Sequence, residues 1–296
     1  MQSPLLLVIL GPTSVGKTDY CLAQAEQWQC PVVNCDSRQI YREIPIGTAA
    51  PTPEEQQRVQ HYFVGTRSLS EDYNAGMYEH DAVTLLTRLA QQHNDDTPFA
   101  ILSGGSMLYM DAVLKGLDNL PPVPATVRQQ VRDNYQQQGL AWLQQEVQRL
   151  DPDYWLTVDQ NNPQRLMHCI EISLAASRPY SALRTRSTAQ RPWRTRIIGL
   201  TRSRDLLYER INRRVDSMME QGLLDEARRA YMPFKQQGLP IPNSLQTVGY
   251  KELIAHLEGQ CTLPEAVEKI KQHSRNYAKR QMTWFRAKTD ISWLTL

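Results

Sequence analysis

Long apolar segments are missing from this chain of 296 residues. The first apolar run, Leu5–Leu10, is short and follows no basic segment, so it is typical of a buried strand rather than of a signal peptide or a membrane span. Internal repeats and low-complexity tails are also missing. With 41% hydrophobic residues, the chain can form a large core. We therefore expect a globular, cytoplasmic protein with no membrane segment.

Cysteine is scarce, and its spacing argues against two classes of protein. The five cysteines are an odd number, and no two of them form a CxxC pair. This pattern argues against a disulfide framework and against a zinc site. We expect buried thiols at Cys21, Cys30, Cys35, Cys169 and Cys261.

Charge of one sign does not dominate, since the net charge is +2, but the charges are unevenly distributed. Residues 1–190 carry 14 Lys and Arg against 20 Asp and Glu, whereas residues 191–296 carry 19 against 11. The basic C-terminal third is compatible with a surface for a polyanion, and equally with solvated helix faces. Charge alone does not decide between the two.

Four short apolar runs, each followed by a polar or glycine-containing turn, indicate the fold class. Helix-like segments separate the runs, which predicts the parallel strands of a P-loop, doubly wound α/β sheet. Ligands of such sheets bind at the carboxyl ends of the strands. The four runs are Leu5–Leu10, Pro31–Asn34, Phe99–Leu102 and Thr195–Leu200.

A proline-rich stretch, GLDNLPPVPATV, interrupts this alternation. After it, residues from about Val127 to Ala176 are rich in glutamine and have helical periodicity. We therefore predict a helical insertion domain at residues 118–190. Residues 1–117 and 191–296 would form the P-loop catalytic core, which closes with long amphipathic helices that include Pro264–Lys288.

A glycine-rich turn, GPTSVGKT, follows the first apolar run. Its spacing fits the Walker A pattern, in which backbone N–H groups surround phosphates, the lysine neutralises their charge and the threonine can bind Mg²⁺. Strand and helix patterns on either side supply the expected context. The predicted diphosphate-binding residues here are Gly11, Pro12, Thr13, Ser14, Val15, Gly16, Lys17 and Thr18.

The aspartate that ends a neighbouring strand in nucleotide hydrolases is missing. The candidate strand, FAIL, is followed by two serines and two glycines, Ser103–Ser106, which suit close approach to a ligand rather than ATP hydrolysis. We therefore expect a diphosphate that departs in a reaction other than phosphoryl transfer. Asp36 follows the second apolar run, where it can accept a proton from a nucleophile or cap a helix instead.

Seven segments, in order and spacing, resemble those of the tRNA dimethylallyltransferase family, also called tRNA isopentenyltransferases. The resemblance extends from about Leu5 to Trp293, which is nearly the whole chain. The segments are GPTSVGKT, NCDSRQIYREIPIGTAAPT, SGGSMLYMDAVLKGL, NPQRLMHCIEI, LYERINRRVDSMMEQGLLDEA, LQTVGYKEL and AKRQMTWFR.

This resemblance implies transfer of a dimethylallyl group from dimethylallyl diphosphate to N6 of the adenosine 3′-adjacent to the anticodon in tRNA, with release of diphosphate. It implies that Asp36 orients and deprotonates the amine, while Lys17 and Arg214 stabilise the departing diphosphate. Thr18 would bind Mg²⁺. Ser106 stands near the reacting centre, where most members have threonine. The implied partners are dimethylallyl diphosphate and the tRNA anticodon stem-loop, and we expect a monomer.

The resemblance also implies a set of tRNA contacts, because an anticodon-loop adenine must leave its stack to react. His168 replaces an arginine common in the family, and histidine is mostly uncharged at neutral pH. Taken without the resemblance, Arg165 and the glutamines would be typical of a polar helix face. The implied tRNA-binding residues are Asp36, Ser37, Arg38, Gln39, Ser106, Arg128, Gln164, Arg165, Leu166, Met167, His168, Gln246, Thr247, Val248, Gly249, Tyr250 and Lys251.

The last predicted helix places Arg275, Lys279 and Arg286 on neighbouring turns. By itself this pattern is typical of a core-packing helix with a solvated basic face. The basic C-terminal third and the resemblance together favour a surface that faces RNA phosphates. Aromatic residues interleave with these cations at Tyr277, Trp284 and Phe285.

Three other functions are compatible with parts of the sequence. Prenyl transfer to a free adenine nucleotide would use the same loop and Asp36, but it requires neither the insertion nor the basic segment. A P-loop small-molecule kinase would consume ATP. A non-catalytic, nucleotide-dependent RNA-binding protein would bind tRNA without forming a product. The sequence has no Cys/His zinc-finger extension, which indicates a bacterial-type enzyme.

Overall fold

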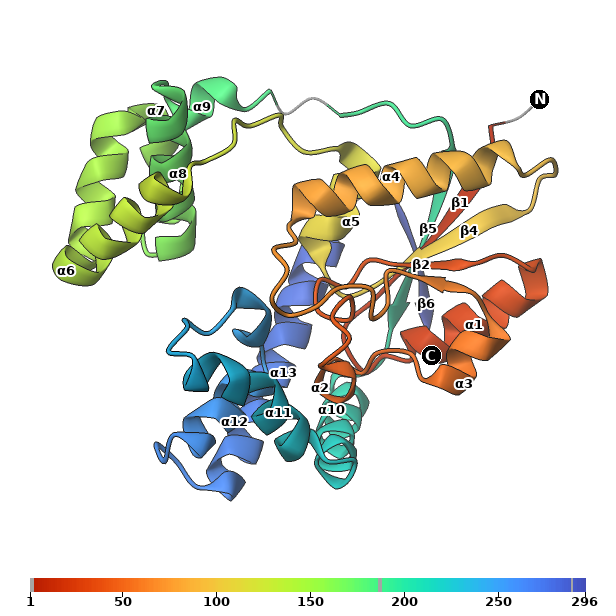
Figure 1. Cartoon of the computed structure of the whole chain (residues 1–296). Coiled ribbons are helices and arrows are strands. Elements are labelled where there is room, and N and C mark those ends of the chain that lie inside the picture. Colours follow the sequence, from red (N-terminus) through yellow and green to blue (C-terminus); the bar gives the residue numbers. More distant parts are fainter. Residues whose placement is uncertain (1–2, 186–187, 289) are drawn as a thin grey trace. The chain divides into compact units, whose positions relative to one another are not determined.

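The structure is a computed structural model that describes residues 3–185, 188–288 and 290–296. Six parallel strands form one sheet in the order β3-β2-β4-β1-β5-β6 (Figure 1). The predicted α/β fold is confirmed, and the four predicted apolar runs are the four inner strands. These are β1 (Leu5–Leu10), β2 (Val32–Asn34), β4 (Pro98–Ser103) and β5 (Arg194–Thr201).

Two edge strands were not predicted from the sequence. They are β3 (His61–Tyr62), whose two residues are half-buried, and β6 (Ile291–Thr295), which is largely exposed. An inner strand of a parallel sheet is covered on both faces and therefore reads as an apolar run, whereas an edge strand lacks that signal.

Helices cover both faces of the sheet (Figure 1). Alternate residues of β1 point to opposite faces, so Leu6 and Val8 pack with α4 (Ala75–Gln91) and α5 (Met107–Lys115). On the other face, Leu7 and Ile9 pack with α1 (Lys17–Trp28) and α10 (Arg204–Glu220). The sheet is thereby fixed between two apolar layers, and the loops at its carboxyl edge carry polar residues.

A further group of helices packs against the segment that follows β2. Ile40, Tyr41 and Ile44 from that segment share a core with apolar residues of the C-terminal helices. The predicted C-terminal helix Pro264–Lys288 is observed within two residues at each end. The elements concerned are α2 (Pro45–Thr48), α11 (Leu223–Gln236), η1 (Asn243–Leu245), α12 (Tyr250–Leu257) and α13 (Leu263–Arg286). Helix α3 (Pro53–Arg58) packs beside α1 instead.

The chain divides into two compact units, Met1–Leu114 together with Gln190–Leu296, and Lys115–Ala189. The second unit has its own core, in which Val131, Leu143 and Ile170 are fully buried. Its helices are α6 (Ala125–Leu150), α7 (Pro152–Trp155), α8 (Pro163–Ala176) and α9 (Tyr180–Leu183).

The cysteines agree largely with expectation, because four are buried thiols and Cys261 is half-buried. Within the described ranges, every helix is too short or too polar to span a lipid bilayer.

Candidate active site

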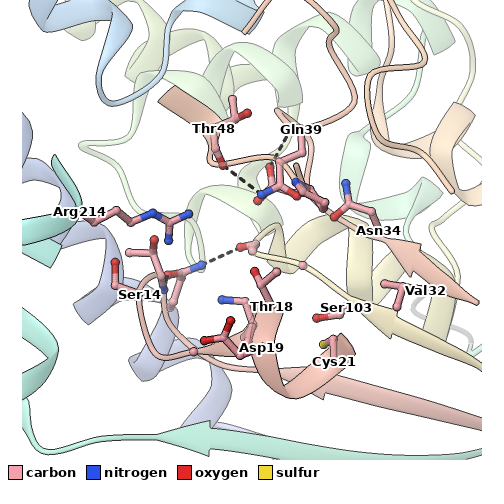
Figure 2. A pocket seen from close by; sticks show the side chains of 18 of the residues that line it. Ser14, Thr18, Asp19, Cys21, Val32, Asn34, Gln39, Thr48, Ser103 and Arg214 are labelled. Carbon is pink, nitrogen blue, oxygen red and sulfur yellow. Dashed lines mark hydrogen bonds between the residues drawn. The ribbon is translucent and has the colours of Figure 1, made fainter. Parts of the chain in front are cut away.

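The loops that follow β1, β2 and β4 meet at the carboxyl edge of the sheet and line a cavity of ≈ 450 Å³. Thr13–Thr18 form one side, and Asp36 lies on another together with Gly104 and Gly105. Arg214 reaches toward Ser14 of the phosphate loop (Figure 2). The structure thus brings together a phosphate-type loop, a carboxylate and a guanidinium.

Lys17 begins α1, and its ammonium group donates hydrogen bonds to the carbonyl oxygens of Gly11 (2.8 Å) and Pro12 (2.9 Å). Burial and the nearby Arg214 lower the pKa of Lys17 to about 8, while Asp36 opposes that change. Lys17 is therefore mostly cationic at pH 7 and suited to neutralise an anion in the cavity.

Three members of the predicted diphosphate set shape the loop and do not line the cavity, so their contact with diphosphate stays a prediction. Val15 is fully buried and packs with the core around Leu7. Pro12 has no N–H group to donate to a phosphate. Gly11 allows close approach, because a β-carbon there would lie 2.8 Å from the carbonyl oxygen of Leu200. The remaining five, Thr13, Ser14, Gly16, Lys17 and Thr18, line the cavity.

Asp36 uses its two carboxylate oxygens differently. Oδ1 accepts the backbone N–H groups of Arg38 (2.9 Å) and Gln39 (3.4 Å) and so caps a turn rather than a helix. Oδ2 lies against Gly105, where a β-carbon would be 2.8 Å away. The capping and proton-accepting interpretations are therefore compatible, since one oxygen fixes the carboxylate and the other remains beside the cavity.

Ser106 ties the loop after β4 to the loop after β2. Its Oγ accepts the Ser37 N–H at 2.8 Å and donates to the Ser37 Oγ at 2.9 Å. Gly104 makes the same contact possible, because a β-carbon there would lie 2.4 Å from the carbonyl carbon of Cys35. These bonds require a hydroxyl at position 106 but not the extra methyl of threonine.

Helix α10 supplies three arginines to the cavity. Arg214 was predicted, and burial lowers its pKa. Arg210 and Arg213 were missed, although Arg210 donates from Nε to the Ser14 carbonyl at 2.9 Å. Arg210 precedes Arg213 by three residues and Arg214 by four, which are the spacings of helical neighbours, and this was the available sequence signal.

A second cavity of ≈ 310 Å³ adjoins the first, and Asp36, Arg214 and Tyr277 line both. Ser37, Arg38 and Ser106 line this second cavity. The Gln39 amide faces the first cavity and donates to the Thr48 carbonyl at 3.0 Å (Figure 2). Asp36 therefore lies where two binding spaces meet.

The residues of the predicted tRNA-binding segment Gln246–Lys251 differ in their exposure to solvent. Thr247, Val248 and Gly249 line the second cavity, and Gln246 and Lys251 are exposed. Tyr250 is fully buried, and its hydroxyl donates to Glu226 Oε1 at 2.5 Å. Tyr250 therefore has no accessible surface in this structure, and its contact with tRNA stays a prediction.

In the unit Lys115–Ala189, Arg128, Gln164, Arg165 and His168 are exposed and Met167 is half-buried. Reduced solvation, followed by the charges of Arg128 and Arg184, lowers the pKa of His168. Arg128 and Arg184 thus lie near His168, and the RNA contacts of this set stay predictions. Leu166 is fully buried in the core of the unit, and its contact with tRNA stays a prediction.

Helix α13 carries the three predicted cations, but their surroundings differ. Arg275 donates to Asn212 Oδ1 at 2.6 Å on α10. Lys279 and Arg286 line a third cavity of ≈ 490 Å³ together with Arg202 and Arg204. Phe285, on another face, is 1% exposed and packs into the core, so the helix both packs and presents cations.

Fold and cavity define an α/β protein of the P-loop class in which a phosphate-binding loop faces a carboxylate. A family model described as IPP transferase matches residues 39–288. The chain is 48% identical to tRNA dimethylallyltransferase 1 of Bacteroides thetaiotaomicron, over 98% of this chain and 91% of that protein. It is 50% identical to tRNA dimethylallyltransferase 1 of Phocaeicola vulgatus, over 97% and 93%.

Among solved structures, the full-length tRNA isopentenylpyrophosphate transferase of Bacillus halodurans superimposes with a TM-score of 0.69 at 32% identity, over 99% of this chain and 90% of that one. The chain belongs to the tRNA dimethylallyltransferase family, as the seven segments indicated.

Proposed function

We propose that this enzyme transfers the dimethylallyl group of dimethylallyl diphosphate to N6 of the adenosine 3′-adjacent to the anticodon of tRNA. The observation that carries the proposal is the place of Asp36, on the wall shared by two cavities, with Lys17 and Arg214 lining the first. A diphosphate bound at the phosphate loop and an adenine in the second cavity would both reach this carboxylate.

In the reaction, N6 attacks C1 of the allylic group, the C1–O bond breaks and diphosphate departs. The N6 proton passes to Asp36, since the exocyclic amine is a weak nucleophile that gains from a positioned base. Lys17, Arg214 and the loop N–H groups stabilise the negative charge that develops on diphosphate. Oδ1 remains bound to the turn, so the carboxylate is held in place during the transfer.

The cavity offers oxygen donors that suit Mg²⁺. The Thr18 and Ser103 hydroxyl groups and the carboxylates of Asp19 and Asp36 line it. A hard, octahedral ion that keeps several waters fits one protein hydroxyl together with diphosphate oxygens. We therefore propose that Thr18 holds Mg²⁺, which would neutralise charge on the departing diphosphate.

Transfer from labelled dimethylallyl diphosphate to total tRNA, compared with AMP, tests the proposal. We expect label in tRNA, at the adenosine 3′ of the anticodon, and little label in AMP. Transfer of the label to AMP and not to tRNA would contradict the proposal. Consumption of ATP, or binding of tRNA without formation of a prenylated product, would also contradict it. The tRNA preference rests on the insertion unit and the basic α13, which a mononucleotide does not require.

A further inference from the structure

Gln281 of α13 is a polar side chain with no accessible surface, although it lies on an otherwise amphipathic helix. Its Oε1 accepts the backbone N–H of Thr13 at 2.9 Å. Its Nε2 donates to the carbonyl oxygen of Gly105 at 2.9 Å. A single amide therefore joins the phosphate loop after β1 to the loop after β4.

The second loop is also the one against which Asp36 packs. A β-carbon at Gly105 would lie 2.8 Å from Asp36 Oδ2 and 3.2 Å from Gln281 Nε2. Tyr277, one turn earlier on α13, donates its hydroxyl to the same Gly105 carbonyl at 2.8 Å. Two side chains of one helix thus fix the backbone that adjoins the proposed base.

We infer that Gln281 is a positioning residue that sets the separation between the leaving-group site and the proton acceptor. The inference rests on the proposed transfer reaction. One end of the amide holds the loop that would bind diphosphate, and the other end holds the loop that adjoins Asp36. In-line displacement depends on that separation, and a displacement of about 1 Å can reduce a rate by ~10²-fold.

The bonding pattern requires one acceptor and one donor at this site, which glutamine supplies. An ionised carboxylate would accept from Thr13 but would face the Gly105 carbonyl with no proton between two oxygens. A protonated carboxyl group would again supply one acceptor and one donor. In Gln281→Glu, the bond to the Gly105 carbonyl should therefore form only when the carboxyl group is protonated.

The test is the pH profile of single-turnover transfer for Gln281→Glu relative to the wild type. We expect the variant to be ~10–100-fold slower at pH 8, and the deficit to shrink as pH falls, because burial raises the pKa of a carboxyl group at this site. Equilibrium tRNA binding should stay within about twofold. Tyr277→Phe, which removes one of the two bonds to Gly105, should slow transfer less and show no recovery at low pH.

Gln272→Glu is the matched control, because Gln272 is exposed on the same helix and the substitution adds the same charge. Rates are normalised to the folded fraction from circular dichroism. A wild-type rate for Gln281→Glu at every pH overturns the inference, as does a deficit that is constant with pH. A wild-type enzyme that does not prenylate tRNA contradicts the proposed function instead, so the two failures are distinguishable.

Discussion

At the scale of single residues, Lys17 supplies the cationic side chain of the phosphate loop. Lys17→Ala should still fold, since Gly11 and Val15 keep their contacts, but it removes the cation opposite the departing diphosphate and its two bonds to loop carbonyls. We expect transfer to fall ~10²–10³-fold, about 2–4 kcal/mol of transition-state stabilisation. Single-turnover rates with saturating tRNA measure this. A variant that turns over like the wild type would remove Lys17 from the mechanism.

The lowered pKa of Lys17 also predicts a pH effect. The group is cationic below its pKa of about 8 and neutral above it. In the free enzyme, affinity for dimethylallyl diphosphate should therefore decline as pH rises through about 8. Titration calorimetry between pH 6.5 and 9.5 measures the decline, and Lys17→Ala should not show it. A flat profile in the wild type would mean that Lys17 does not contact the diphosphate.

Asp36 allows its two oxygens to be tested separately. Asp36→Asn keeps an oxygen that can accept the Arg38 N–H, so the turn should form, but the amide cannot take the N6 proton. We expect tRNA binding to persist while transfer slows ~10²–10⁴-fold, the usual contribution of general-base catalysis. Should the single-turnover rate stay unchanged, the carboxylate is only a cap.

At the scale of elements, the sequence predicts those strands, helices and loops that have a pattern among neighbouring residues. The inner strands are continuous apolar runs, and the phosphate loop is a contiguous motif, so both were found. Edge strand β6 is only five residues long and mixes three apolar residues with a serine and a threonine, so it forms no continuous apolar run. Within motifs, local sequence does not separate residues that face a ligand from those that face the core, which is why the predicted sets include the fully buried Val15, Leu166 and Tyr250. Gln281 bonds residues 268 and 176 positions away, and only the fold brings them together.

Helix α8 gives a prediction of its own at His168. The pKa of His168 lies below its ordinary value near 6.5, so the ring is neutral at pH 7.5 and gains charge only in more acidic solution. If the surface with Arg128 and Arg165 contacts tRNA, wild-type affinity should rise as pH falls toward 5.5. His168→Arg should bind more tightly at pH 7.5, with a salt slope steeper by about one unit, and lose that pH response. Equal affinities and slopes for both proteins would place His168 outside the RNA contact.

At the scale of the whole molecule, part of the excess positive charge in residues 191–296 lies around the third cavity. Arg202, Arg204, Lys279 and Arg286 line the third cavity, and the described lining contains no Asp or Glu. Its floor is apolar, with Leu207 and Ala278 buried. Four cations in a described lining without Asp or Glu side chains repel one another, and phosphates of a polyanion would relieve that repulsion.

Neutralising Lys279 and Arg286 together should therefore weaken tRNA binding and flatten the plot of log K against log salt by up to about two units, if both contact phosphates. Arg275→Ala should change the slope little, because Arg275 is bound to Asn212. Arg228→Ala is a further control, since that exposed arginine on α11 pairs with Asp225. Affinity for dimethylallyl diphosphate should not change in the double variant, as the third cavity shares no described residue with the first. A double variant with the parent's salt slope and tRNA affinity would make this a solvated face, and recognition would then rest on the second cavity and on the insertion unit.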